Sequence, residues 1–150
     1  MSFLKTILES TKEVESPRRY FYWAGIAALA SILGRKVSVD RSGKYFLYPN
    51  VYVFLVSKRS GLRKSPSVNM CRKLLHLQGN VRIIDGQNSI QGVIKELSQV
   101  HTTDMKCIIS KAEGLLISGE FANFLIADRE ASPLTNLTDL YDTQNYEEGW

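Results

Sequence analysis

The hydrophobic pattern of the first sixteen residues is helical. An apolar stripe recurs at three- and four-residue steps, and charged residues alternate on the opposite face, which predicts a short amphipathic helix. The stripe consists of Phe3, Leu4, Ile7 and Leu8.

A second helix is predicted over about residues 17–33. Ser16-Pro17 is a typical helix start, and Gly34 is a plausible stop. Its apolar run, residues 20–33, is shorter than the roughly 20 residues that span a bilayer, so we interpret it as a buried helix. Its aromatic residues, among them Tyr20, Tyr22 and Trp23, are expected to pack in the core.

The next segments alternate between strand and helix patterns. Residues 36–40 and 44–49 read as two short strands or a hairpin, with Gly43 in the turn. The continuous apolar run Val51–Val56 predicts a strand buried on both faces. Apolar residues then recur at helical steps over about 65–77, before Gly79, which predicts a helix.

The second half of the chain continues this alternation. Strands are predicted at residues 81–85, 106–110 and 114–118, and helices at 88–100, 120–128 and 134–142. Strands that alternate with helices favour an α/β sheet. We find no internal repeat and no low-complexity linker, and 150 residues suit a single domain, 1–150.

The net charge of +4 is modest, but its distribution is uneven. A window of sixteen residues without Asp or Glu holds Lys58, Arg59, Arg63, Lys64, Arg72 and Lys73. Such a window favours an anionic partner. From residue 128 onward the charge becomes acidic. The two cysteines are far apart, which indicates reduced thiols and a cytoplasmic location, and no segment predicts a membrane partner.

The basic window contains the clearest chemical signal. A phosphate-binding loop needs converging N–H groups, a lysine for the β- and γ-phosphates and a hydroxyl for Mg²⁺, all at a helix start. Lys64-Ser65 supplies the lysine and the hydroxyl, and Gly61 lies in the middle of the loop. Lys58 and Arg63 occupy the two consensus glycine positions. The strand before and the helix after favour a phosphate loop, whereas the missing glycines leave a basic surface turn open.

Residues spread over nearly the whole chain resemble the P-loop ATPase, helicase-like domains of phage, plasmid and mobile-element replication proteins. The stretches that carry the resemblance are "ESPRRYFYWAGIAALASILGRKV", "LYPNVYVFLVSKRSGLRKSPSV", "SIQGVIKEL", "LLISGEFANFL" and "LTDLYD". In that family the loop often has a central glycine and an arginine before Lys-Ser, which matches Gly61, Arg63, Lys64 and Ser65. Lys58 departs from the family, and its side chain either crowds the β-phosphate or points to solvent.

The resemblance implies an α/β, P-loop NTPase-like sheet with flanking helices, preceded by a helical segment. The leading helices and hairpin are then residues 1–48, and the nucleotide-binding core is 49–150. It implies ATP and Mg²⁺ as cofactors, held by Ser60, Gly61, Leu62, Arg63, Lys64 and Ser65. Lys64 is expected to be catalytic, and the Ser65 hydroxyl to be a metal ligand.

The second half of such a site is an acidic residue at the end of a neighbouring strand. Glu120, after the apolar residues 115–117, resembles the Walker B glutamate, which implies a catalytic and metal-binding role. Gly119 stands where the preceding aspartate often lies. Glu120 is also explained as a carboxylate at the start of a helix, where the helix dipole favours it. Asp85 and Asp104 are weaker candidates.

The pattern ends soon after the Walker B-like strand, so we expect an incomplete, N-terminal portion of the fold. We expect this portion alone to bind nucleotide weakly and to hydrolyse it slowly or not at all. The full-length protein is expected to contact DNA and to form a homo-oligomer. Two further hypotheses stand beside the ATPase. One is a non-enzymatic scaffold or interaction protein with a degenerate P-loop, and the other is an α/β domain whose basic turn is incidental.

Overall fold

The computed structural model describes residues 2–58, 62–85, 90–98, 113–119, 121 and 133–142. The chain divides into two compact units, each of which is built from two separate stretches. Unit 1 contains Met1–Gly34 and Pro49–Val81, and unit 2 contains Arg35–Tyr48 and Arg82–Trp150.

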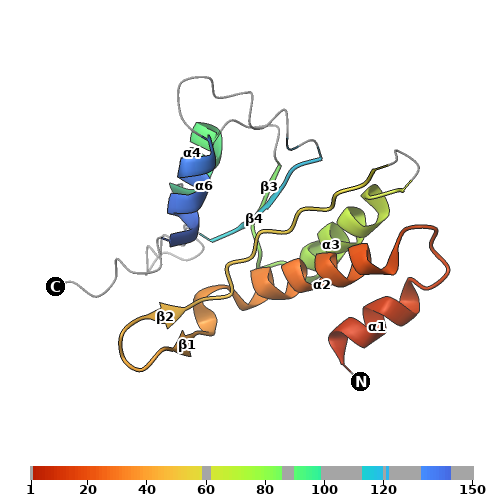
Figure 1. The fold of residues 1–150 in the computed structure, drawn as a ribbon, viewed down its shortest axis with the longest axis horizontal. Coiled ribbons are helices and arrows are strands. Elements are labelled where there is room, and N and C mark those ends of the chain that lie inside the picture. The colour runs from red at the N-terminus through yellow and green to blue at the C-terminus, as the bar shows by residue number, and fades with distance from the viewer. Residues whose placement is uncertain are drawn as a thin grey trace. The chain divides into compact units, whose positions relative to one another are not determined.

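Unit 1 is a helical unit in which α2 (Arg18–Leu33) packs against both α1 (Phe3–Ser10) and α3 (Ser65–Gln78) (Figure 1). The three predicted helices are therefore confirmed, and the bounds of α2 and α3 differ from the prediction by one residue, while α1 ends at Ser10, before the end of the predicted amphipathic segment. The buried apolar residues of this unit are Ile7, Tyr20, Phe21, Ala24, Ala28, Cys71 and Leu75. A Cβ added at Gly25 would lie 3.0 Å from Ile7 Cδ1, so the missing side chain allows α1 to approach α2 closely.

The aromatic residues of α2 divide between the core and the surface. Tyr20 is 3% exposed, as predicted, whereas Trp23 is 48% exposed and Tyr22 is also exposed. The prediction of core packing is therefore wrong for these two, which pack edge to face against each other at 5.7 Å. Successive helical residues point about 100° apart, so four consecutive aromatic residues, 20–23, cannot all share one buried face. In the described part of the chain, no helix combines the length and apolarity that crossing a membrane requires.

The apolar run before α3 lies outside both described sheets. Figure 1 shows residues 49–58 as an extended trace. Side chains alternate along it, with Val53 and Leu55 half-buried and Tyr52, Phe54 and Val56 exposed. Alternation of this kind arises when an extended backbone is covered on one side only. The prediction of a strand buried on both faces is therefore wrong, because the run joins neither described sheet and only alternate side chains are covered.

The helix after the loop begins and ends where the sequence predicts. Ser65 is its first residue, and Pro66 occupies its first turn, where a missing N–H costs nothing. The helix ends before Gly79, whose φ of 72° is left-handed and whose N–H donates to the Leu75 carbonyl at 3.1 Å. This geometry is typical of a glycine C-cap.

Unit 2 contains two small sheets. The short 3₁₀ turn η1 (Gly34–Lys36) leads into the predicted hairpin, in which β1 (Val39–Asp40) pairs antiparallel with β2 (Phe46–Leu47). Farther along the chain, β3 (Ile83–Asp85) pairs in parallel with β4 (Leu115–Ile117) (Figure 1). The four strands predicted within residues 36–40, 44–49, 81–85 and 114–118 are confirmed, each over two or three residues.

Helices α4 (Ile90–Ser98) and α6 (Pro133–Asp142) confirm two more predicted elements. Ile84 of β3 and Val93 of α4 form the centre of a small core. The partly buried residues packed against it are Leu97, Leu116, Phe121 and Leu137. The parallel strand pair thus shares a core with helices, and the α/β, P-loop NTPase-like sheet stays a prediction. The predicted strand at 106–110 and most of the predicted helix at 120–128 lie outside the described residues.

Candidate phosphate-binding loop

The start of α3 presents a cation and a hydroxyl to solvent. Lys64 is the N-cap residue, Ser65 is the first helical residue, and both are exposed. The first turn of an α-helix carries partial positive charge and N–H groups that point outward, and both features attract anions. The helix itself is fixed in place, because Ser67, Cys71 and Leu75 on its other side are buried.

Two first-turn N–H groups of α3 already have an acceptor within the chain. The N–H groups of Ser67 and Val68 donate to the Lys64 carbonyl at 3.2 and 3.4 Å, and the Ser67 hydroxyl donates to the same oxygen at 2.7 Å. Pro66 has no N–H. Ser65 therefore contributes the one first-turn N–H that no described carbonyl accepts. The described part of the loop therefore offers fewer N–H donors than a glycine-rich phosphate loop. Binding of an anion here would depend more on the charge of the Lys64 ammonium.

Two buried hydroxyl groups hold the stems of the loop. The Tyr20 hydroxyl donates to the Val56 carbonyl at 2.8 Å, and the Ser16 hydroxyl donates to the Arg63 carbonyl. Both donors lie at the start of α2 and are nearly inaccessible to solvent. Sequence reasoning missed both contacts, because a pairing between distant positions leaves no periodic signal in a single sequence.

Arg63 also has a side-chain partner. Its Nη1 lies 2.9 Å from Glu15 Oε2, and the two side chains are 68% and 73% exposed. Exposed pairs of this kind contribute roughly 0–1 kcal/mol, so the contact is weak enough for a bound anion to replace it. The guanidinium is nevertheless directed to Glu15 in this structure. Arg63 therefore contacts other residues of unit 1 through both its carbonyl oxygen and its guanidinium group.

The other predicted site residues are less completely placed. Leu62 is half-buried and Lys58 is exposed, while Ser60, Gly61 and Glu120 lie outside the described residues. The positions of these three residues therefore stay predictions. The parallel register places Asp85 opposite Ile117, so the two strands end at the same edge of this sheet. A Cβ added at Gly119 meets no atom within 4 Å, which shows open space at this end of β4.

The described residues suit phosphate better than they define a metal centre. An exposed ammonium at a helix start is a common phosphate ligand. Mg²⁺ usually takes one or two protein ligands beside phosphates and waters, and Ser65 is a described hydroxyl that fits this role. Among the residues that the structure describes, no group of three or more His, Cys, Asp or Glu side chains could hold a metal ion.

Comparison of the chain with protein-family models, with curated proteins and with solved structures finds no match.

Proposed function

We propose that the loop of residues 58–65, together with the start of α3, binds the phosphates of ATP with Mg²⁺. The exposed Lys64-Ser65 pair at the N-terminus of an anchored helix is the observation that carries this proposal. The surrounding window of basic residues without Asp or Glu supports it, because it raises the local concentration of anions. No residue of the loop other than Lys64 combines a charge with this position at the helix start.

The proposed roles follow from the chemistry of each side chain. Lys64 holds the β- and γ-phosphates, and the Ser65 hydroxyl binds Mg²⁺. Backbone N–H groups from Ser60 to Arg63 complete the contacts to phosphate. Glu120 orients the attacking water where hydrolysis occurs. With these roles, the chain is the N-terminal part of a replicative, helicase-like ATPase of a phage or mobile element.

A second candidate function is a non-enzymatic scaffold or interaction protein with a degenerate loop. The contacts of Arg63 favour it, since both its carbonyl oxygen and its guanidinium are engaged by residues 15 and 16. Lys58 and Arg63 also replace glycines that a nucleotide would need for close approach to the backbone. On this view the loop is a structural connection, and Lys64 is an ordinary surface lysine.

Titration with ATP and Mg²⁺ separates the two candidates. Lys64→Ala removes a charge-assisted contact, which weakens nucleotide binding about ten- to hundredfold if the ammonium contacts phosphate. Lys73→Ala is the matched control, because Lys73 is an exposed lysine on the same helix and its loss changes the net charge equally. Equal binding by wild type and Lys64→Ala, or no binding by wild type at millimolar ATP, favours the scaffold.

A further inference from the structure

The hairpin of unit 2 is exposed along its whole length. Every residue from Arg35 to Leu47 is exposed, including apolar side chains that a core would normally cover. These apolar residues are Val37, Val39, Tyr45, Phe46 and Leu47. Two-stranded hairpins are marginally stable on their own, and exposed aromatic residues on one of them indicate a contact surface.

The charge of this hairpin is strongly positive. Residues 35–48 contain the basic residues Arg35, Lys36, Arg41 and Lys44 against the single acid Asp40, four minus one, a net charge of +3. Asp40 is used within the turn, where its Oδ1 accepts the Gly43 N–H at 2.8 Å. No ion pair within the described part of the chain involves Lys36, Arg41 or Lys44. The surface is therefore complementary to a polyanion.

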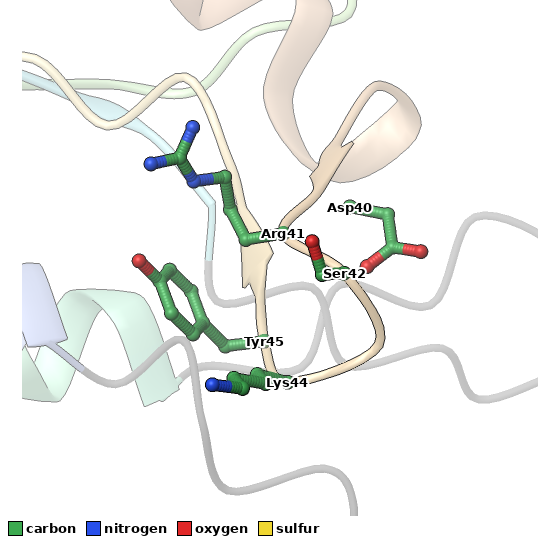
Figure 2. A pocket seen from close by; sticks show the side chains of 5 residues that line it. All are labelled: Asp40, Arg41, Ser42, Lys44 and Tyr45. Atoms are coloured by element: carbon green, nitrogen blue, oxygen red, sulfur yellow. The ribbon is translucent and has the colours of Figure 1, made fainter.

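An aromatic ring lies among these cations. Arg41 and Tyr45 face each other across the hairpin, because the Arg41 N–H donates to the Tyr45 carbonyl at 3.0 Å. Figure 2 shows the side chains of Arg41, Lys44 and Tyr45 on one side of the hairpin and that of Asp40 on the other. Together with Ser42 these residues line a hollow of about 500 Å³. Asp40 is the one acid of this hollow, and its Oδ1 is already bound by the Gly43 N–H.

The base of the hairpin already contains a contact between a cation and a ring. The Arg35 guanidinium carbon lies 4.7 Å from the centroid of the Tyr48 ring. Tyr48 is half-buried, so Tyr45, which is 42% exposed, offers the more accessible aromatic face. An unpaired base can stack on such a face, whereas a base in a duplex is already stacked on its neighbours.

We propose that this hairpin binds single-stranded nucleic acid. Arg41 and Lys44 contact backbone phosphates, and the Tyr45 ring stacks on an unpaired base between them. Interleaved cations and an exposed ring distinguish this surface from the basic loop before α3. The described residues between Phe54 and α3 include no aromatic side chain. The proposal stands independently of nucleotide binding at Lys64.

Fluorescence anisotropy with a labelled oligo(dT) of about 12 nucleotides tests this surface, because OB-fold sites for single strands cover roughly 4–16 nucleotides and this length lies within that range. Tyr45→Ala is expected to weaken binding roughly five- to hundredfold, and Tyr45→Phe to retain it, because the ring is what stacks. Tyr22→Ala, which removes another exposed tyrosine, is the matched control and should bind like wild type. Circular dichroism checks that each variant is folded.

The salt dependence tests the phosphate contacts separately. Arg41→Ala/Lys44→Ala should lower the slope of log affinity against log salt by about 1.4, since each phosphate contact on a single strand contributes about 0.7. Lys5→Ala/Lys12→Ala removes the same charge from exposed positions of unit 1 and should leave the slope unchanged. Lys64→Ala should also bind the oligonucleotide like wild type, which separates this proposal from nucleotide binding.

Three results would overturn the proposal. The first is that wild type does not bind oligo(dT) at about 50 mM salt, where phosphate contacts are strongest. The second is that the hairpin variants and their controls lose affinity equally. The third is that a duplex of the same length or polyglutamate competes as well as the single strand, which would identify a general polyanion or acidic-protein surface.

Discussion

The Ser16 hydroxyl donates a hydrogen bond to the main-chain carbonyl of Arg63, 47 positions later in the chain. Tyr20, one helical turn beyond Ser16, donates in the same way to Val56. The residues between the two acceptors belong to the first part of the loop 58–65 that we propose binds phosphate, and Lys64-Ser65 follows the second acceptor directly. Two hydroxyl groups at the start of α2 therefore hold the chain at Val56 and at Arg63.

Ser16→Ala should destabilise the protein by about 1 kcal/mol, because the buried hydroxyl is lost and the Arg63 carbonyl loses its donor. Urea unfolding measures this change. The matched control is Ser31→Ala, since the Ser31 hydroxyl donates only to the Ala27 carbonyl within α2. Local bonds of this kind add little to helix stability, so the control should remain within about 0.5 kcal/mol of wild type. Equal losses in the two variants would contradict the anchoring role of Ser16.

Tyr20→Phe removes the hydroxyl and keeps the buried ring, so it isolates the hydrogen bond to Val56. A loss of about 0.5–1.5 kcal/mol is expected. Limited proteolysis should in addition cut faster between residues 56 and 63, because one stem of the loop is released. Tyr22→Phe serves as the control, as its side chain is exposed. Unchanged cleavage in Tyr20→Phe would show that the bond does not restrain the loop.

Burial raises the pKa of the Cys71 thiol to about 11, with Arg72 acting in the opposite direction. The unfolded thiol ionises near 9.0, so the folded state favours the neutral form. This contribution to stability is complete below about pH 9 and is lost as the pH rises through about 11. A difference of about two pKa units corresponds to about 2–3 kcal/mol.

Comparison of wild type with Cys71→Ala measures this linkage. Between about pH 8 and 11, wild type should lose about 2–3 kcal/mol more unfolding free energy than the variant, which lacks the titrating group. In a Cys107→Ser background, where Cys71 is the remaining thiol, alkylation near neutral pH should follow global unfolding. Rapid alkylation of the native protein would contradict the burial of Cys71.

Gly114 and Gly119, on either side of β4, should respond differently to the same substitution. A Cβ at Gly114 would lie 3.2 Å from the Arg82 carbonyl oxygen, a backbone atom that cannot move away cheaply, whereas a Cβ at Gly119 meets open space. Gly114→Ala is therefore expected to destabilise the protein by about 1 kcal/mol or more, and Gly119→Ala by less than about 0.5 kcal/mol. Thermal unfolding compares the two, and the reverse order would contradict the parallel register of β3 and β4.

The helix boundaries could be predicted because their signals are local. Ser16-Pro17 marks the start of α2, and Gly79 ends α3 through a left-handed conformation that the residue type itself favours. The parallel strands could be predicted as strands, but their pairing depends on residues about thirty positions apart. Periodicity describes one segment at a time and carries no information about such partners.

The environment of the apolar run 51–56 could not be predicted for the same reason. Its composition indicates a buried strand, but burial depends on which elements cover each face, and in the structure only alternate side chains are covered. The exposed hairpin is a similar case. Its alternating residues are typical of a hairpin with one buried face. Only the folded structure shows that the Tyr45 side chain is exposed to solvent.

The direction of translation adds a consequence to the two hydroxyl anchors. Ser16 and Tyr20 precede their acceptors by 47 and 36 positions. A ribosome adds roughly 5–20 residues per second, so both donors are synthesised seconds before the carbonyl groups they bind. The segment around the start of α2 is thus available as a template when the loop emerges. A nascent chain that stalls between α2 and the loop leaves the apolar face of α2 without its partner α3, and exposed apolar surface of this kind is what chaperones protect.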